Sequence, residues 1–490
     1  MPRSNRDDRR EIDFSFQPAD VSTPADDDEV FPIAILGDFS GRANQSPGTT
    51  GILAQIDYDN FEKVFAKFGV SLRLASPGTA TEEQTVQFRR LEDFHPDELL
   101  HQIQSLSRLF DVRGRLINPA RAEAAVAEAQ AILKTEVTST TPLPAAASTE
   151  TTEEVLTRLL GKPATSERPR AASKLDELIK QIVRPSVVAA PSVEQTQLVQ
   201  LIENELSKGL RHLLHNPNFQ ALESAWRGID FLVREAGEQS KFYLIDISKS
   251  ELLGLLVVGE LTKSAIFKHL EQIRPAVLLG LYTFGLDDHV LLDLLGSFAA
   301  ALRTSFVGEA SPELVGCNSF GLPADPDEWT NLPMLEKFDA VRRKPQSAHL
   351  GLLMPRFLLR QPYGPNSDPI ESFPFQEMPD SSEHESYLWG NPALLCGYLL
   401  EDAFAASAWD LNVSEGGQIV GLPVHTFPAE GGETQAKPCA EAWLSKRAAE
   451  VIRRRGFMPI ASIRGRDAVE IKAIHSFSLP PKSLIIRPRA

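Results

Sequence analysis

A stretch rich in Thr, Pro, Ala and Ser divides the 490-residue chain into two unequal parts. Residues 134–150 offer too little apolar surface to offset the entropy lost on ordering, so we expect a disordered linker here. A chain of this length also exceeds what one hydrophobic core usually serves. The predicted segments are a flexible leader with one edge strand (1–29), a first lobe (30–133), the linker (134–191), a second lobe (192–480) and a basic tail (481–490).

Apolar runs alternate with helix-like segments on both sides of this linker. Val30–Leu36 has the length and composition of a buried strand, and Pro96–Leu116 has a helical pattern. Beyond the linker, strand-like runs at Phe242–Ile247 and Val277–Phe284 precede an apolar helix at 290–302. This alternation predicts an α/β (mixed α+β) fold with some parallel pairing, in which mixed sheets are flanked by helices. Further predicted strands are Val70–Leu74, Val86–Arg89, Leu350–Leu359, Ile419–Phe427, Met458–Ile463 and Val469–Ile474.

Local signals mark several helix ends. Ser192 and Gln195 form a capping box before a helical stripe of leucines. Asn216-Pro217 ends that helix and starts the next, because proline is tolerated at the first helical position. Gly456 after three arginines predicts a helix C-terminus, where cations face the negative end of the helix dipole.

The leader contains one strand-like segment. Its apolar residues alternate with polar ones, which is the pattern of a half-buried strand. These candidate interface residues are Ile12, Phe14 and Phe16.

The linker contains a short amphipathic pattern at i, i+3, i+4 and i+7 that ends before Pro185. Two interpretations stay open: a nascent helix within a tether, or a helix that docks on a partner. The apolar positions, which are candidate interface residues in the second case, are Leu175, Leu178, Ile179 and Ile182.

Charge and composition restrict the partners and the compartment. The net charge of −16 disfavours nucleic acid and anionic membranes, because both would be repelled. The three cysteines lie far apart, which indicates reduced thiols rather than a disulfide framework. The first ten residues lack the apolar region of a signal peptide, and no run approaches the ~18–20 apolar residues needed to cross a bilayer. We expect a cytoplasmic protein that is not inserted in a membrane.

Catalytic patterns are missing from the sequence. Residues 37–41, Gly-Asp-Phe-Ser-Gly, lack the lysine and the spaced glycines of a phosphate loop, so a turn after a strand is the better interpretation. His212 and His215 are three residues apart with no carboxylate between them, unlike a His-Glu-x-x-His metal site. There is no Gly-x-Ser-x-Gly nucleophile elbow. We therefore predict no catalytic residue, no cofactor and no metal ligand, and a protein that is not an enzyme.

Two arginines stand out as interface candidates. Arg356 and Arg360 lie four apart in an apolar segment, and in a strand they would share one face. Two buried guanidinium groups need carboxylate partners, and Glu371, Glu377 and Glu385 follow in the sequence. The pairs form either an internal ion-pair lattice or contacts between subunits.

The segment that carries these arginines resembles a known family. Pro355–Gly364 (PRFLLRQPYG), Tyr387–Asn391 (YLWGN) and Phe219–Gly228 (FQALESAWRG) are similar to motifs of the large contractile-sheath subunit of type VI secretion systems, the TssC or VipB (EvpB) family. Phe31–Gly41 (FPIAILGDFSG) resembles the small sheath subunit, TssB or VipA, as do residues 57–62 and 91–96. The family makes these as two chains that fold together, whereas here they are one, so the resemblance implies that the two lobes pack together.

The resemblance implies a function. It implies a non-enzymatic sheath-like protomer that combines the TssB and TssC roles. The implied partners are other sheath subunits (copies of this chain, or TssB and TssC), the Hcp inner tube, the baseplate and the AAA+ unfoldase ClpV. Sheath subunits exchange strands, so the strand at 12–16 is the expected donor, while the helix at 173–183 resembles part of the unfoldase-binding helix.

Two expectations concern how the fused chain departs from the family. The second half resembles a C-terminally shortened large subunit, which leaves a second function open: a non-polymerising adaptor or cap that regulates assembly at a sheath end or the baseplate. A tether raises the effective concentration of the two halves to the order of mM. Whether it joins them within one protomer or bridges neighbours is open from sequence.

Overall fold

Strands from both halves of the chain pair with one another in one large sheet. The computed structural model describes residues 17–18, 30–42, 52–76, 79–118, 120–137, 192–237, 239–259, 263–321, 325–329, 335–379, 383–428 and 434–486. These residues form two compact units, one drawn from 1–103 and 209–490 and the other from 104–208. The predicted linker and leader strand fall almost wholly outside the described residues.

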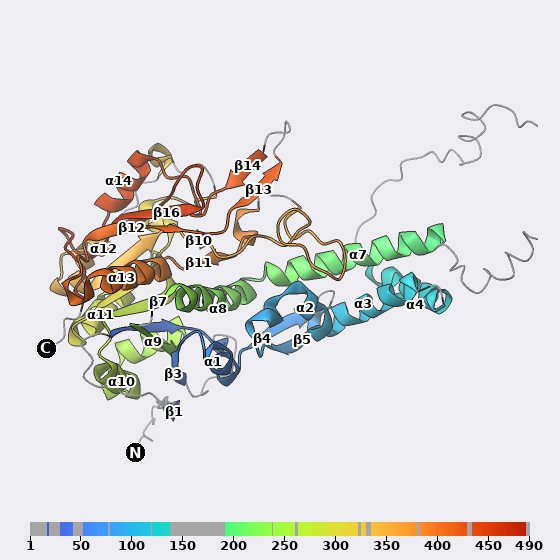
Figure 1. Ribbon diagram of the computed structural model, residues 1–490, viewed down its shortest axis with the longest axis horizontal. Helices are drawn as coiled ribbons and strands as arrows, with labels where there is room; N and C mark the ends of the chain where they lie inside the picture. The colour runs from blue at the N-terminus through green and yellow to red at the C-terminus, as the bar shows by residue number, and fades with distance from the viewer. Residues whose placement is uncertain are drawn as a thin grey trace, which may run out of the picture. The chain divides into compact units, whose positions relative to one another are not determined.

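The first unit is built on a ten-stranded sheet with the order β1-β3-β6-β2-β7-β8-β9-β15-β16-β12 (Figure 1). Its central pairs, from β6 through β2, β7, β8 and β9 to β15, are parallel, whereas β3 and the final strands β16 and β12 pair antiparallel. The sheet is therefore mixed, as the alternation of strands and helices predicted. Its strands are β1 (Gln17–Pro18), β2 (Phe31–Gly37), β3 (Ile52–Ile56), β6 (Ser240–Asp246), β7 (Val277–Phe284), β8 (Ser305–Ala310), β9 (Leu350–Met354), β12 (Glu415–Val420), β15 (Met458–Ser462) and β16 (Ala468–Ala473).

β2 carries the strongest link between the two halves of the sequence. It lies between β6 and β7, and its seven residues pair in register with all seven of β6. Every residue of β2 is buried, since a central parallel strand is covered on both faces. The first lobe thus contributes interior strands to the sheet of the second, and the co-packing predicted from sequence is confirmed.

Helices cover both faces of this sheet (Figure 1). Adjacent residues of β7, such as Leu278 and Leu279, point to opposite faces of the sheet. Leu278 belongs to a core with α9, α10, α11 and α12, whereas Leu279 packs against Gly397 of α13. Ile452 of α14 belongs to the same core as Leu278, and Gly228 of α8 packs against Leu394 of α13. The helices are α1 (Phe61–Lys67), α2 (Pro96–Gln102), α8 (Pro217–Glu235), α9 (Lys249–Val257), α10 (Ala265–Ile273), α11 (His289–Ala301), α12 (Leu335–Arg342), α13 (Ala393–Ser407) and α14 (Lys446–Arg454).

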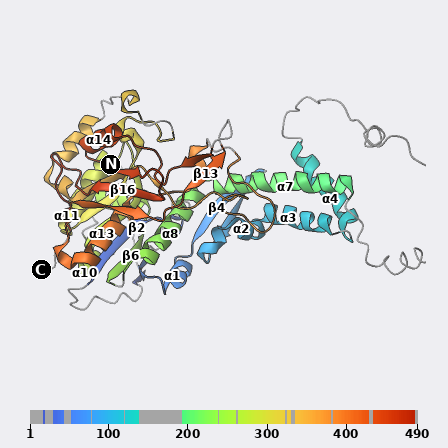
Figure 2. The same cartoon turned by 45° about the horizontal axis from the view of Figure 1, so that its top comes forward.

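Three small two-stranded sheets complete this unit. They are the antiparallel pairs β4 (Ser71–Ser76) with β5 (Thr79–Gln87), β10 (Phe357–Leu358) with β11 (Trp389–Gly390), and β13 (His425–Pro428) with β14 (Thr434–Lys437). The hairpin β13–β14 is visible in both cartoon views (Figures 1 and 2).

The described residues of the second unit form helices. It contains α3 (Gln104–Ile117), α4 (Ala122–Val137) and the part of α7 (Val193–Leu214) up to residue 208. Arg113 of α3 and Glu203 of α7 form an ion pair at 2.7 Å, and Arg115 of α3 bonds Glu128 of α4 at 2.8 Å. No helix in the described ranges is long and apolar enough to cross a membrane.

Several predicted elements need correction at their boundaries. The helix predicted over 96–116 is two helices, α2 and α3, because Ile103 adopts an extended conformation between them. The strand predicted at 350–359 ends at Met354, and the one predicted at 419–427 is interrupted at Gly421, which has a positive φ of 76°. α4 extends to Val137, four residues into the predicted linker.

Candidate functional site

A tryptophan of the second half is enclosed by phenylalanines of the first. The indole of Trp226, on α8, donates a hydrogen bond to the carbonyl of Phe39 at 2.8 Å. Four phenylalanine rings surround it, with centroids 4.4–5.9 Å from the indole, and they are Phe39, Phe61, Phe65 and Phe68. Aromatic pairs of this kind contribute beyond their buried area. The halves therefore share one aromatic core.

A polar cluster joins the same halves where β2 and β6 end. The Asp246 carboxylate accepts bonds from the Phe39 amide at 2.9 Å and the Ser40 hydroxyl at 2.7 Å. Arg42 lies 3.7 Å from Asp246 and bonds Glu251 at 2.7 and 2.9 Å. Burial raises the pKa of Asp246 to about 6, although the Ser40 hydrogen bond and the Arg42 charge act in the opposite direction. The turn at 37–41 is thus structural, as the sequence predicted, and its amides serve a carboxylate of the same chain.

Arg360 lies in a closed internal network. Its guanidinium donates to Glu223 at 2.9 Å and to both oxygens of Glu377 at 2.7 and 3.1 Å, and it stacks 4.3 Å from the Tyr363 ring. Arg227 also pairs with Glu223, with its Nε 2.7 Å from the carboxylate. Burial would raise the pKa of Glu223, but the two arginines lower it. All ionic groups of this network are paired within the chain.

Arg356 belongs to a second cluster nearer the surface. Its Nη2 contacts Glu441 and also Glu385 at 2.9 Å. Burial opposes ionisation of Glu441, yet the Arg356 charge and hydrogen bonds from His384 and Arg356 lower its pKa to about 2. Glu309, close by on β8, has its pKa raised to about 7 by burial, with Arg356 opposing the shift. The cluster therefore holds two carboxyl groups with opposite pKa shifts.

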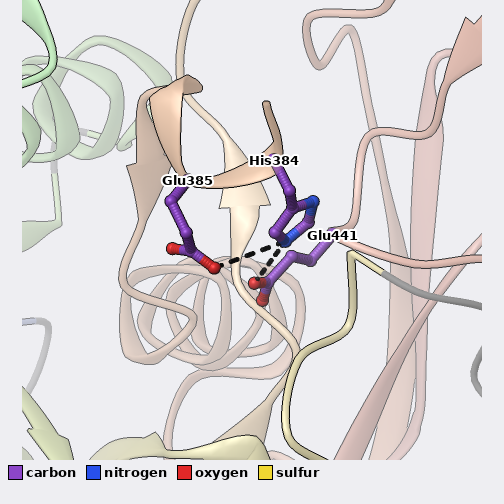
Figure 3. Close-up of side chains that lie close together, drawn as sticks. All are labelled: His384, Glu385 and Glu441. Carbon is purple, nitrogen blue, oxygen red and sulfur yellow. Dashed lines mark hydrogen bonds and ion pairs between the residues drawn. The ribbon is translucent and has the colours of Figure 1, made fainter. Parts of the chain in front are cut away.

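His384, Glu385 and Glu441 have the composition of a metal site (Figure 3). Their ligand atoms lie within 4.8 Å of one another, and His384 Nε2 is 2.9 Å from Glu441. However, Nη2 of Arg356 already contacts both carboxylates, and the Lys437 ammonium lies 2.8 Å from His384 Nδ1. Two fixed cations beside the ligands repel a divalent ion, so this arrangement serves as an ion-pair cluster.

The same cluster anchors the hairpin β13–β14. His425 and Lys437 are cross-strand partners at its base. Lys437 contacts His384, and its ammonium lies 5.2 Å from the Tyr387 ring centroid, while His425 Nδ1 lies 2.9 Å from the Tyr387 hydroxyl. The hairpin beyond this base is largely exposed. The cluster thus ties an exposed two-stranded sheet to the body.

The structure separates the two arginines that sequence reasoning placed on one face. The segment between them is a strand only at Phe357–Leu358, so the side chains of Arg356 and Arg360 enter different clusters. The interpretation as internal ion pairs agrees with these contacts, and pairing between subunits stays a prediction. Glu377 and Glu385 are partners as predicted, whereas Glu371 bonds Asp97 through its amide. The remaining predicted interface residues, at 12–16 and 175–182, lie outside the described residues.

Sequence reasoning missed two of the carboxylates. Glu223 and Glu441 lie 137 and 85 residues from the arginines that they pair with. A search among nearby residues could not find them. A weak signal existed for Glu223, which lies inside the family-like motif at 219–228.

Comparison with known proteins supplies two family matches in this one chain. Residues 196–478 match the VipB model, described as the EvpB tail sheath N-terminal domain. Residues 3–146 match the model of VipA of type VI secretion systems. The type VI secretion system sheath protein TssC1 of Pseudomonas aeruginosa is 31% identical over 368 residues, which cover 68% of this chain and 72% of that relative.

Proposed function

The chain belongs to the sheath family of type VI secretion systems and joins VipA-type and VipB-type domains in one polypeptide, and from this premise we propose that it acts as a sheath-like protomer that combines the TssB and TssC roles. In this role it is a structural component, and its partners are other sheath subunits. We further propose that it works in the cytoplasm without catalytic activity.

One observation carries this proposal. β2 of the VipA-type half pairs along its whole length with β6 of the VipB-type half, and Trp226 fills the aromatic core between them. Because these strands are buried on both faces, separating the two halves would expose apolar surface on each of them. The linker then joins two halves of the same protomer, and the fusion fixes their ratio at one to one.

Strand exchange supplies the proposed contact between protomers. The donor is the alternating segment with Ile12, Phe14 and Phe16, and the acceptor is the hairpin β13–β14. An isolated two-stranded sheet is marginally stable in water, and added strands would complete it through main-chain hydrogen bonds. The side chains of this hairpin are half-buried or exposed, so other described elements cover it only in part.

The other partners follow from the family role. In the family role, the sheath surrounds an Hcp inner tube and its assembly begins at a baseplate, so we propose both as partners. The predicted amphipathic segment with Leu175, Leu178, Ile179 and Ile182 is the proposed contact for ClpV. Capture of ClpV by a 150–190 peptide tests this contact, and capture no better than with a scrambled peptide would contradict it.

Electron microscopy of the purified chain tests the main proposal. We expect tubes or rings when the chain is alone or mixed with the proteins encoded beside it. Replacement of Ile12 and Phe14 by Asp should abolish these assemblies while leaving the melting temperature unchanged. The matched control changes Asp13 and Ser15, on the opposite face of the predicted strand, to Asn, and it should assemble normally.

The adaptor or cap is the competing outcome. If the purified chain instead forms monodisperse particles that shorten sheaths made of separate TssB and TssC subunits, the adaptor or cap role is correct and the protomer role is not. A hydrolase activity abolished by one point substitution would contradict both.

A further inference from the structure

Two exposed arginines precede the neighbouring parallel strands β7 and β8. Arg274 ends α10 just ahead of β7, and Arg303 follows α11 just ahead of β8. The first residues of the two strands are partners in register, and the Thr304 hydroxyl donates to the Ala276 carbonyl at 2.7 Å. Because parallel strands begin at the same edge of a sheet, both arginines belong to the amino edge of the large sheet.

Both arginines have a left-handed backbone, with φ of 52° at Arg274 and 57° at Arg303. A Cβ atom makes this conformation costly, so glycine is the usual residue at such a helix end. Three other helices of the same unit follow this rule, with Gly69 after α1, Gly259 after α9 and Gly456 after α14. Backbone strain concentrates at functional positions, and arginine in place of glycine at two neighbouring sites indicates that these side chains are needed.

The helix dipole does not by itself account for these arginines. Cations stabilise the negative end of a helix, and α14 gains this benefit from Arg453 and Arg454 while it keeps glycine at the left-handed position. Neither Arg274 nor Arg303 forms an ion pair with a carboxylate among the described residues. The two charges therefore remain available to a partner outside the protomer.

Exposed carboxylates follow the same two strands at the opposite edge of the sheet. Asp287 lies in the turn after β7, and Glu313 comes three residues after β8. A Cβ atom on Gly285, in the turn after β7, would lie 3.8 Å from a carboxylate oxygen of Glu313, so the two strand ends are close together. Asp288 is held by Lys249 at 2.6 Å, whereas Asp287 and Glu313 form no ion pair within the part of the chain that the structure describes.

We propose that copies of this chain pack head to tail, with Arg274 and Arg303 of one copy against Asp287 and Glu313 of the next. Opposite charges at the two ends of the same strands are complementary between copies, and such charges fix orientation and register. Two chains of net charge −16 repel each other, so a cationic edge is where an acidic surface can approach. A head-to-tail contact closes into rings or continues into filaments. The inference rests on the proposed sheath function, for which it specifies one contact between protomers.

Charge reversal tests this contact by sedimentation and electron microscopy of the full chain at low salt, where exposed charges are least screened. One variant carries Arg274→Glu and Arg303→Glu, and the other carries Asp287→Arg and Glu313→Arg. Each alone should lose assembly, because like charges then face each other. An equimolar mixture should recover assembly, since every edge again meets an edge of opposite charge. All four positions are exposed, so the melting temperatures should stay near that of the wild type.

Replacement of both arginines by glycine separates folding from binding. Glycine relieves the two left-handed positions, so the melting temperature of Arg274→Gly with Arg303→Gly should not fall. Assembly should nevertheless weaken, because the two cations are lost. Unchanged assembly in this variant would contradict the contact, whereas a fall in melting temperature with normal assembly would assign the arginines to helix stability.

The matched control reverses Arg73 of β4 and Arg89, just after β5, to Glu. Both are exposed and form no ion pair among the described residues, so the net charge changes equally at another place. This control should assemble like the wild type, and an equal loss of assembly in it would show a general charge effect and contradict the contact.

The remaining outcomes distinguish the contact from the sheath function. Normal assembly of either charge-reversed variant, or a mixture that fails to recover assembly, makes the contact wrong and leaves the function standing. The same holds if the wild type alone stays monomeric but forms tubes with the proteins encoded beside it. If it assembles under neither condition, both proposals are wrong.

Discussion

Arg360 and Arg356 stand four residues apart in one family-like motif, yet their surroundings differ. Arg360 and its carboxylates Glu223 and Glu377 are buried, and every charge has a partner inside the chain. The side chain of Arg356 is 27% exposed, and its partner Glu385 is 68% exposed. A buried network that is complete within the chain stabilises the protomer. One that reaches the surface can exchange partners, so the second cluster is where contacts between protomers should be sought.

The largest expected effect is on the Arg360 network. Arg360→Met leaves Glu223 and Glu377 buried with too few cations, and we expect a loss of about 3–5 kcal/mol in the free energy of unfolding. Urea unfolding of the full chain measures it. Arg447→Met is the exposed control and should cost less than about 1 kcal/mol. Equal losses in the two variants would remove the distinction between buried and surface arginines.

Glu441 should show the next largest effect, and it should depend on pH. Because its folded pKa is about 2, below the ordinary value of 4.5, its ionised form stabilises the fold above pH 4.5. This stability, about 3 kcal/mol, is lost as the pH falls from 4.5 through 2. Glu441→Gln should be less stable at pH 7 by a similar amount, and the difference should shrink in acid. A difference that stays constant with pH would contradict the linkage.

Glu309 should behave in the opposite sense. Its folded pKa of about 7 lies above 4.5, so the stability of its protonated form is present below pH 4.5 and is lost as the pH rises through 7. We expect Glu309→Gln to be more stable than the wild type by about 3 kcal/mol at pH 8, with little difference at pH 4. Chemical unfolding at both pH values measures this. Exposed Glu415→Gln is the control, and a gain of the same size there would show a general charge effect.

The smallest stability effect is expected at Glu385. An exposed ion pair contributes about 0–1 kcal/mol, so Glu385→Gln should hardly change the melting temperature. If the exposed cluster pairs with a neighbouring protomer, this variant should instead weaken assembly in electron micrographs and sedimentation. Normal assembly together with normal stability would leave Arg356 as an internal ion pair only.

Local signals in the sequence were sufficient for element type and for several boundaries. Ser192 and Gln195 form their capping box, with bonds at 2.7 and 3.1 Å, and Asn216 caps α8 ahead of Pro217. Gly456 has the positive φ expected after the arginines of α14. These features depend on neighbours within four residues, so they can be predicted from the sequence directly.

Long-range pairing was beyond local patterns. The sequence predicted that the lobes pack together, but not that β2 enters between β6 and β7. Nor did it reveal Glu441 as the partner of Arg356, because strand order and the ends of parallel strands decide which distant side chains meet.

The sequence by itself determined the class of fold, the family motifs and the lack of catalytic patterns, since periodicity and short motifs are local properties. Only the tertiary structure decided that the two halves share one sheet and that Arg356 and Arg360 enter separate clusters. The physical reason is that burial and charge pairing depend on which segments the fold brings together, and that choice is made by the whole core at once.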